Sequence, residues 1–175
     1  NSILDTLEAF KIKANFFEVG NQVLRNPKIT QKVFEKGHEV GSHSWSHKKL
    51  TAELEKTAHA EILDGQKAIL DVLGTLASPF FRFPYGARNK ALQEFVQNQN
   101  LATFFWNIDT LDWKHKNPKA LYQYALREVM KENRGIVLMH DIRPQTAIVL
   151  PILLRELAKK GYRTTYFKSK ERPLP

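Results

Sequence analysis

Short apolar runs rich in β-branched and aromatic residues alternate with amphipathic stretches along this 175-residue chain. Such alternation is typical of repeated strand and helix units around a parallel sheet. Strands are expected at residues 14–19, 38–42, 80–83, 102–108, 135–139 and 162–166. The sequence therefore predicts an α/β fold with parallel strands, in a chain that has the size of one domain.

Amphipathic stretches predict the helices that separate these strands. They are expected at residues 1–7, from about residue 29, at 52–73, after 89, at 117–131 and at 146–160. Thr51 is the expected cap of the third helix, and Asn117-Pro118 is a strong helix start because Asn caps a helix and Pro fits its first turn. Gly161 should end the last helix, and Pro151 predicts either a kink or a later start of that helix.

Composition excludes several classes of protein. Apolar residues make up 42% of the chain and aromatic residues 11%, so intrinsic disorder is not expected. The longest apolar run, residues 147–154, is far shorter than the roughly 18 residues that a membrane span needs. Without cysteine there is no disulfide, thiolate zinc site or cysteine nucleophile. The net charge of +9 favours anionic surroundings, but no nucleic-acid motif accompanies it.

Polar residues of catalytic type follow four consecutive strands of the predicted sheet. They are His43 and His47, Arg82, Asp109 and Asp112, and His140 and Asp141. In α/β folds the chemistry collects on the loops at the carboxyl ends of the strands. The sequence therefore predicts a catalytic site formed by these loops.

His43-Ser44-Trp45-Ser46-His47 places two imidazoles four residues apart. On a helical turn this spacing brings both rings to one side and suits a single metal ion. A catalytic zinc normally takes three protein ligands, so the pair would supply two of them. Zinc proteases with this spacing carry Glu after the first His, and Ser44 in that place excludes the protease interpretation. The alternative is two solvent-facing histidines in a polar loop.

Each of the other candidates also has a structural alternative. Arg82 ends an apolar strand, where an unpaired guanidinium is costly, so either a carboxylate partner or an extension to water is expected. Asp109 and Asp112 could each cap a turn, and for Asp109 alone this interpretation is favoured. His140 follows an apolar run and is a candidate general acid, whose tautomer a neighbouring carboxylate would fix.

Four segments together resemble one family in residue type and order. They are His43-Ser44-Trp45-Ser46-His47, Arg82-Phe83-Pro84-Tyr85-Gly86, Asp109-Thr110-Leu111-Asp112-Trp113 and Leu138-Met139-His140. The set resembles the polysaccharide deacetylase family, which is carbohydrate esterase family four, or the nodulation-protein-B homology domain. The resemblance covers essentially the whole chain. It implies a distorted (β/α) barrel of parallel strands.

The family's first motif, Thr-Phe-Asp-Asp, has no counterpart in this sequence, which starts after the corresponding strand. In the family its first Asp is the catalytic base and its second Asp is a metal ligand. We therefore expect an N-terminally incomplete catalytic domain at residues 1–167, with the first strand and both Asp residues upstream, and a loosely held tail at residues 168–175. A degenerate family member is the alternative.

The resemblance also implies a role for each matched residue. His43 and His47 would bind a divalent metal, for which zinc is the first candidate and which lowers the pKa of its bound water to about 7. Arg82 would hold the upstream base, and the backbone N–H of Tyr85 would stabilise the oxyanion. His140 would protonate the leaving amine.

Three further residues complete this predicted site. Asp112 would orient His140. Trp113 and Leu138 would line the pocket for the acetyl methyl group, for which ordinary core packing is the alternative.

The implied function is a metal-dependent N-deacetylase that hydrolyses acetamide groups of N-acetylglucosamine in peptidoglycan or a chitin-like polymer and releases acetate. The alternatives are a catalytically inactive glycan-binding member and a deacetylase of O-acetyl esters such as acetylxylan. The expected partner is an N-acetylated polysaccharide, with no nucleic acid and no membrane span. Such a substrate implies a location outside the cytoplasm, in the periplasm, at the cell surface or secreted.

Overall fold

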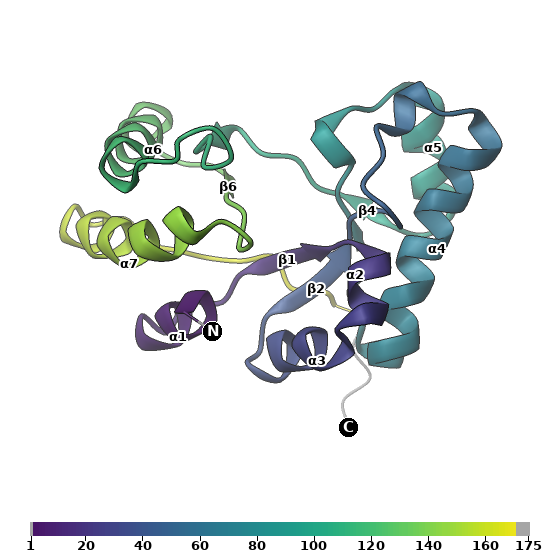
Figure 1. Ribbon diagram of the computed structural model, residues 1–175, viewed down its shortest axis with the longest axis horizontal. Helices are drawn as coiled ribbons and strands as arrows, with labels where there is room; N and C mark the ends of the chain where they lie inside the picture. The colour runs from purple at the N-terminus through teal and green to yellow at the C-terminus, as the bar shows by residue number, and fades with distance from the viewer. Residues whose placement is uncertain (1, 171–175) are drawn as a thin grey trace. The chain divides into compact units, whose positions relative to one another are not determined.

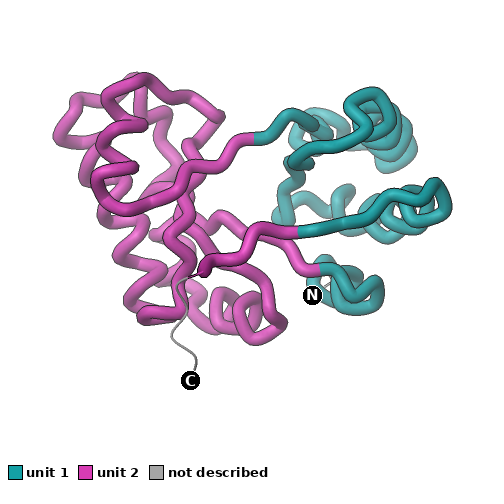
Figure 2. Tube along the Cα trace, turned by 180° about the vertical axis from the view of Figure 1, so that it is seen from behind, with its two compact units in different colours: residues 1–12, 106–165 teal, residues 13–105, 166–175 magenta. Residues whose placement is uncertain are grey.

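Two separate parallel sheets organise the chain, which the computed structural model describes over residues 2–170. Unit 1 comprises residues 1–12 and 106–165, and unit 2 comprises residues 13–105 and 166–175 (Figure 2). Residues 171–175 of the predicted tail lie outside the described residues. Within residues 2–170, no helix is both long and apolar enough to cross a membrane.

Unit 2 is built on a four-stranded parallel sheet with the order β1-β2-β3-β4. Its strands are β1 Asn15–Glu18, β2 Glu39–Ser42, β3 Phe80–Phe81 and β4 Ala102–Thr103. Ser42 pairs with Phe81, so β2 and β3 end side by side. Because parallel strands end at the same edge of a sheet, the loops after β2 and β3 leave the sheet from neighbouring positions.

The helices of unit 2 pack around this sheet (Figure 1), and Val40, Phe80 and Phe81 of its strands are buried. They are α2 Gly20–Arg25, α3 Pro27–Glu35, α4 Glu55–Leu73 and α5 Lys90–Asn98, with short 3-10 turns at Leu50–Ala52, Gly74–Leu76 and Pro84–Gly86. Ile62 of α4 packs with Phe81 and Phe83, and all three are fully buried. Asn89 caps α5 by accepting the N–H of Leu92.

Unit 1 has a two-stranded parallel sheet of β5 Ile108–Asp109 and β6 Val137–Leu138. Its helices are α1 Ser2–Ala9, α6 Pro118–Glu132 and α7 Pro144–Lys159. α6 packs against α7, and their interface buries Leu121, Val149 and Leu153 (Figure 1). Asn117 caps α6 by accepting the N–H of Ala120, as the sequence predicts.

The predicted α/β class with parallel strands is confirmed, but two of the predicted strands are wrong. Residues 102–108 form two strands, β4 and β5, because the chain passes from unit 2 to unit 1 between them. Residues 162–166 form no strand. Just beyond them, the Asn15 carboxamide donates to the carbonyl of Phe167 at 2.7 Å and accepts its N–H at 3.0 Å. The stretch predicted as a strand contains the point, between residues 165 and 166, at which the chain passes from unit 1 to unit 2.

Several predicted helix boundaries also move. α2 is unpredicted, since it is short and no side chain caps its start. α3 begins at Pro27, ahead of the expected Ile29. α4 begins after Leu54 and not behind Thr51, because Leu50–Ala52 forms a 3-10 turn first. α7 begins before the predicted residue 146 and carries Pro151 inside it.

Candidate active site

The two predicted metal ligands of unit 2 lie next to each other on the loop after β2. The ring centroids of His43 and His47 are 4.8 Å apart, with an angle of 73° between the ring planes. The predicted helical turn is wrong, because Ser44 and His47 adopt the left-handed region with φ of +64° and +63°. A tight irregular loop, and not helix geometry, brings the two imidazoles together.

A backbone carbonyl fixes the tautomer of His43. Its Nδ1 lies 2.6 Å from the carbonyl oxygen of Arg82, in the loop after the adjacent strand β3. A carbonyl oxygen only accepts hydrogen bonds, so Nδ1 carries the proton and the lone pair of the neutral ring is on Nε2. Metal-binding histidines are commonly held in this way by a fixed oxygen on the other ring nitrogen.

The donor set of this loop fits part of a catalytic metal site. Two neutral imidazoles suit zinc and other divalent transition metals. Within residues 2–170, no group of three His, Cys, Asp or Glu side chains could hold a metal ion. His43 and His47 could therefore supply two of the three protein ligands, and the described residues do not supply the third.

Unit 2 also contains two other predicted site residues, Tyr85 and Arg82. Tyr85 lies in the Pro84–Gly86 turn with φ of +59°, a conformation that non-glycine residues rarely adopt. Its ring makes an edge contact with the His47 ring at a centroid distance of 4.7 Å. The Arg82 guanidinium lies over the ring of Phe17, 5.0 Å from its centroid. Unit 2 thus places the Arg-x-Pro-Tyr segment against the histidine loop.

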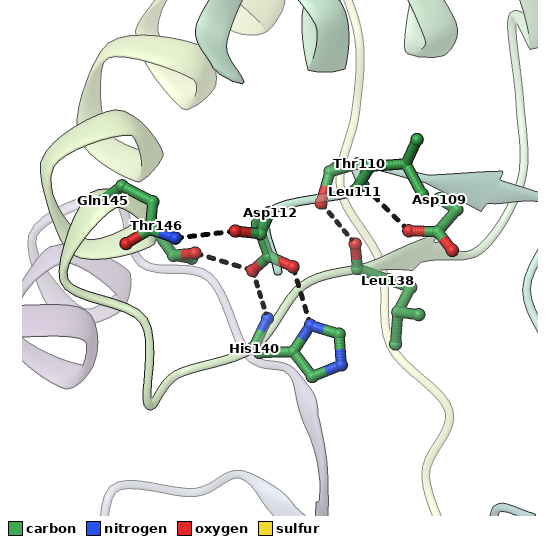
Figure 3. Close-up of polar contacts among 8 residues, drawn as sticks. All are labelled: Asp109, Thr110, Leu111, Asp112, Leu138, His140, Gln145 and Thr146. Atoms are coloured by element: carbon green, nitrogen blue, oxygen red, sulfur yellow. Dashed lines mark hydrogen bonds and ion pairs between the residues drawn. The ribbon is translucent and has the colours of Figure 1, made fainter. Parts of the chain in front are cut away.

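Unit 1 joins Asp112 and His140, which are 28 residues apart in the sequence (Figure 3). Oδ1 of Asp112 lies 2.6 Å from Nδ1 of His140, and Oδ2 accepts both the backbone N–H of His140 and the hydroxyl of Thr146, each at 2.6 Å. Gln145 donates to the backbone carbonyl of Asp112 at 2.7 Å. The carboxylate is fully buried and receives three donors from two residues.

These hydrogen bonds decide the charge of Asp112. Burial by itself would raise the pKa of this carboxyl, but the hydrogen bonds from His140 and Thr146 outweigh burial and lower the pKa below its usual value. Asp112 is therefore ionised at neutral pH, and Nδ1 of His140 must carry a proton. Nε2 of His140 points away from Asp112 (Figure 3), and the side chain is 28% exposed. The ring can therefore exchange a proton with a substrate through Nε2.

The other predicted residues of unit 1, Asp109, Leu138 and Trp113, differ in their contacts and exposure. Oδ1 of Asp109 accepts the N–H of Leu111 at 2.8 Å, which is the turn-capping interaction favoured from sequence. Leu138 is buried and pairs with Asp109 across β5 and β6. Trp113 is 50% exposed, as a substrate-contacting ring can be and a core residue is not.

Sequence reasoning missed the polar residues that hold these candidates in place. They are Ser44, Glu61, Gln145 and Thr146. Thr146 had a weak signal, since the last helix was expected to begin there and its hydroxyl lies in the first turn of α7. Glu61 had none, because it looks like any other acidic residue on an amphipathic helix.

A comparison with protein families identifies the family of the chain. The family model described as polysaccharide deacetylase matches residues 1–104. The chain belongs to the polysaccharide deacetylase family. This membership confirms the resemblance seen in the four sequence motifs. The roles of the individual site residues are not tested by it and stay predictions.

Curated members of the polysaccharide deacetylase family match over nearly the whole chain. A peptidoglycan N-acetylglucosamine deacetylase of Listeria monocytogenes is 39% identical over 160 residues, which are 91% of this chain and 33% of the relative. A peptidoglycan N-acetylmuramic acid deacetylase of Bacillus subtilis is 32% identical, over 93% of this chain and 33% of the relative. The chain thus spans about a third of the length of these two relatives.

Solved structures of polysaccharide deacetylases share the fold. A peptidoglycan deacetylase of Bdellovibrio bacteriovorus superposes with a TM-score of 0.89 at 36% identity, over 97% of this chain and 48% of the other. A pseudoenzyme of carbohydrate esterase family 4 from Bacillus anthracis superposes with a TM-score of 0.84 at 25% identity, over 94% and 57% of the two chains. This likeness confirms the predicted fold class.

Proposed function

We propose that this protein is a metal-dependent N-deacetylase that removes acetyl groups from N-acetylglucosamine units of peptidoglycan and releases acetate. The Asp112–His140 pair carries the proposal, since a buried ionised carboxylate holds a histidine whose second nitrogen faces away from it. Family membership and two relatives named as peptidoglycan deacetylases support the substrate class. A cell-wall polymer as substrate would imply a location outside the cytoplasm.

In this proposal His140 supplies the proton that the leaving amine needs. Cleavage of an acetamide adds water to the acetyl carbonyl and breaks the C–N bond, and an unprotonated amide nitrogen is a very poor leaving group. Protonated His140 donates from Nε2 while Asp112 keeps the proton on Nδ1, so the ring ends neutral in a defined tautomer. Asp112 stabilises the charged ring before the transfer.

His43 and His47 would hold the metal, together with a third ligand outside the described residues. When bound, a divalent metal such as zinc polarises the carbonyl and lowers the pKa of its water to about 7. Arg82 would hold the general base, and the backbone N–H of Tyr85 would stabilise the oxyanion. Trp113 and Leu138 would contact the acetyl methyl group.

Acetate release by the full-length protein tests this function. The substrates are peptidoglycan fragments and N-acetylglucosamine oligomers, with acetylxylan as the O-acetyl ester comparison. We expect His43→Ala and His140→Ala both to abolish turnover, but only His43→Ala to lose metal, measured by elemental analysis of the purified protein. Equal loss of metal in both variants would show that His140 has been assigned wrongly. No acetate from any acetylated glycan would refute the function.

A catalytically inactive, glycan-binding member is the second candidate. The observation that favours it is the likeness to a solved structure named as a pseudoenzyme of the same family. This candidate expects saturable binding of peptidoglycan fragments without acetate release, even with added zinc. Isothermal calorimetry and the acetate assay on one preparation distinguish the two candidates.

A further inference from the structure

Glu61 is a buried carboxylate of α4 that the proposed reaction does not use. It is only 5% exposed. Its Oε2 accepts the backbone N–H of Ser46 at 2.8 Å, and its Oε1 accepts the Ser46 hydroxyl at 2.5 Å. The backbone carbonyl of Glu61 accepts the N–H of Trp45 at 2.8 Å. One helix residue therefore binds three donors of the loop that joins His43 to His47.

This loop needs such support because its backbone is strained. Ser44 and His47 both have positive φ, which persists in non-glycine residues only where the surrounding structure fixes it. Within the loop, the N–H of His47 donates to the hydroxyl of Ser44 at 3.0 Å. Glu61 of α4 holds Ser46, the residue immediately before His47, and thereby fixes the loop next to the second imidazole.

The same face of α4 also fixes the first half of the loop. One turn beyond Glu61, a Cβ on Gly65 would lie 2.4 Å from the carbonyl carbon of Ser44, so α4 touches the loop backbone directly. On the other side, the N–H groups of Gly20 and Asn21 donate to the carbonyls of Ser44 and Trp45 at 2.9 and 3.0 Å. Among these contacts to the loop, Glu61 supplies the one that involves an acidic side chain.

We propose that Glu61 is a positioning residue that fixes the direction of the His47 imidazole through Ser46 and thereby raises the metal affinity of the site. The inference rests on the proposed function in one respect, that His43 and His47 bind the metal. Lys48 lies 3.9 Å from Oε1 of Glu61 but is half exposed, so it contributes little to this effect.

Four variants separate positioning from general stability. Glu61→Ala removes both acceptors, and Ser46→Ala removes only the hydroxyl donor. Glu61→Gln keeps the shape, because its carbonyl can accept the Ser46 N–H while its amide donates to the Ser46 hydroxyl. Ser78→Ala is the matched control, since Ser78 makes the same kind of buried hydrogen bond to Glu39 elsewhere in unit 2.

Zinc affinity is measured on the full-length protein by competition with a chromophoric chelator. Removing a partner that orients a metal ligand typically costs 10–100-fold in affinity, so we expect a loss of about this size for Glu61→Ala. Ser46→Ala should lose less, and Glu61→Gln should stay within about threefold of the wild type because its hydrogen bonds are retained. Ser78→Ala should bind zinc as the wild type does.

Amide hydrogen exchange of the metal-free protein gives a second readout that does not depend on zinc. We expect the amides of Ser46 and His47 to exchange about tenfold faster or more in Glu61→Ala, and at the wild-type rate in Glu61→Gln. If Glu61→Ala binds zinc as tightly as the wild type, or if Ser78→Ala weakens zinc equally, the positioning role is refuted. A wild type that binds no zinc refutes the proposed function instead, and the exchange rates then decide whether Glu61 holds the loop.

Discussion

Asp112→Asn tests how the buried carboxylate acts on His140. The substitution keeps the size of the side chain but replaces one acceptor oxygen by an NH2 group. Oδ2 accepts two donors, the N–H of His140 and the hydroxyl of Thr146, whereas Oδ1 faces only Nδ1 of His140. The oxygen of the introduced amide therefore stays in the place of Oδ2, and its NH2 faces Nδ1.

Two N–H donors cannot face each other at the 2.6 Å that separates Oδ1 from Nδ1. His140 must then move its proton to Nε2 or rotate away, and the doubly protonated ring loses its charged partner. A hydrogen bond to a charged group is worth about 1.5–3 kcal/mol. General acid catalysis typically contributes about 10²–10⁴-fold, which corresponds to roughly 3–5 kcal/mol of activation free energy. We expect kcat for acetate release to decrease by about 10²–10⁴-fold and KM to change little.

Thr146→Val is the matched control for this substitution. It removes one neutral donor to the same carboxylate but leaves the contact between Oδ1 and Nδ1 intact. Because the lost hydrogen bond is to a charged group, the free energy of unfolding should fall by about 1.5–3 kcal/mol, while kcat should fall less than tenfold. Steady-state acetate release and urea denaturation of the three proteins provide the measurements. A folded Asp112→Asn enzyme with kcat within about threefold of the wild type would refute the orienting role of Asp112.

Two other predictions concern stability. Burial, with Lys13 and Lys36 nearby, lowers the pKa of His38 to about 4 from 6.5. Between these two pH values the unfolded chain therefore binds more protons than the folded chain. The free energy of unfolding should rise by about 3 kcal/mol from about pH 4 to pH 6.5. His38→Gln should flatten this rise, which urea titrations at several pH values measure. An equal pH slope in both proteins would contradict this. Gly65→Ala should destabilise unit 2 by about 1–3 kcal/mol, because the added Cβ would lie 2.4 Å from the Ser44 backbone. An unchanged urea midpoint would contradict this prediction and show that the loop backbone shifts to accommodate the Cβ.

The fold class could be predicted because hydrophobic periodicity is a local property of the sequence. The same reasoning failed at residues 102–108, where one apolar run supplies strands to two different sheets. Strand partners lie far away in the sequence, and a single run contains no information about them. Residues 162–166 have a strand-like composition but form no strand, and the chain passes from unit 1 to unit 2 within this stretch.

The residues of the proposed site could be found from the sequence, but the side chains that hold them in place could not. His43, Asp112 and His140 stand in recognisable segments at the ends of strands. Thr146 and Glu61 act through hydrogen bonds to residues that are 34 and 15 positions away in the sequence, and no spacing rule connects them. The positive φ of Ser44 was equally invisible, because serine has no special preference for that region.

In two histidines of this chain an oxygen atom lies at Nδ1 and fixes the ring, but the group that supplies the oxygen differs. Nδ1 of His43 is held by a neutral backbone carbonyl, and Nδ1 of His140 by the carboxylate of Asp112, each at 2.6 Å. Both arrangements put the proton on Nδ1 and leave Nε2 for chemistry. A carbonyl suits a neutral ring that offers its lone pair to a cation, whereas a carboxylate also stabilises the imidazolium that gives up a proton. The acceptor at Nδ1 therefore distinguishes the proposed metal ligand from the proposed general acid. This is why only His43→Ala is expected to lose metal although both alanine variants should be inactive.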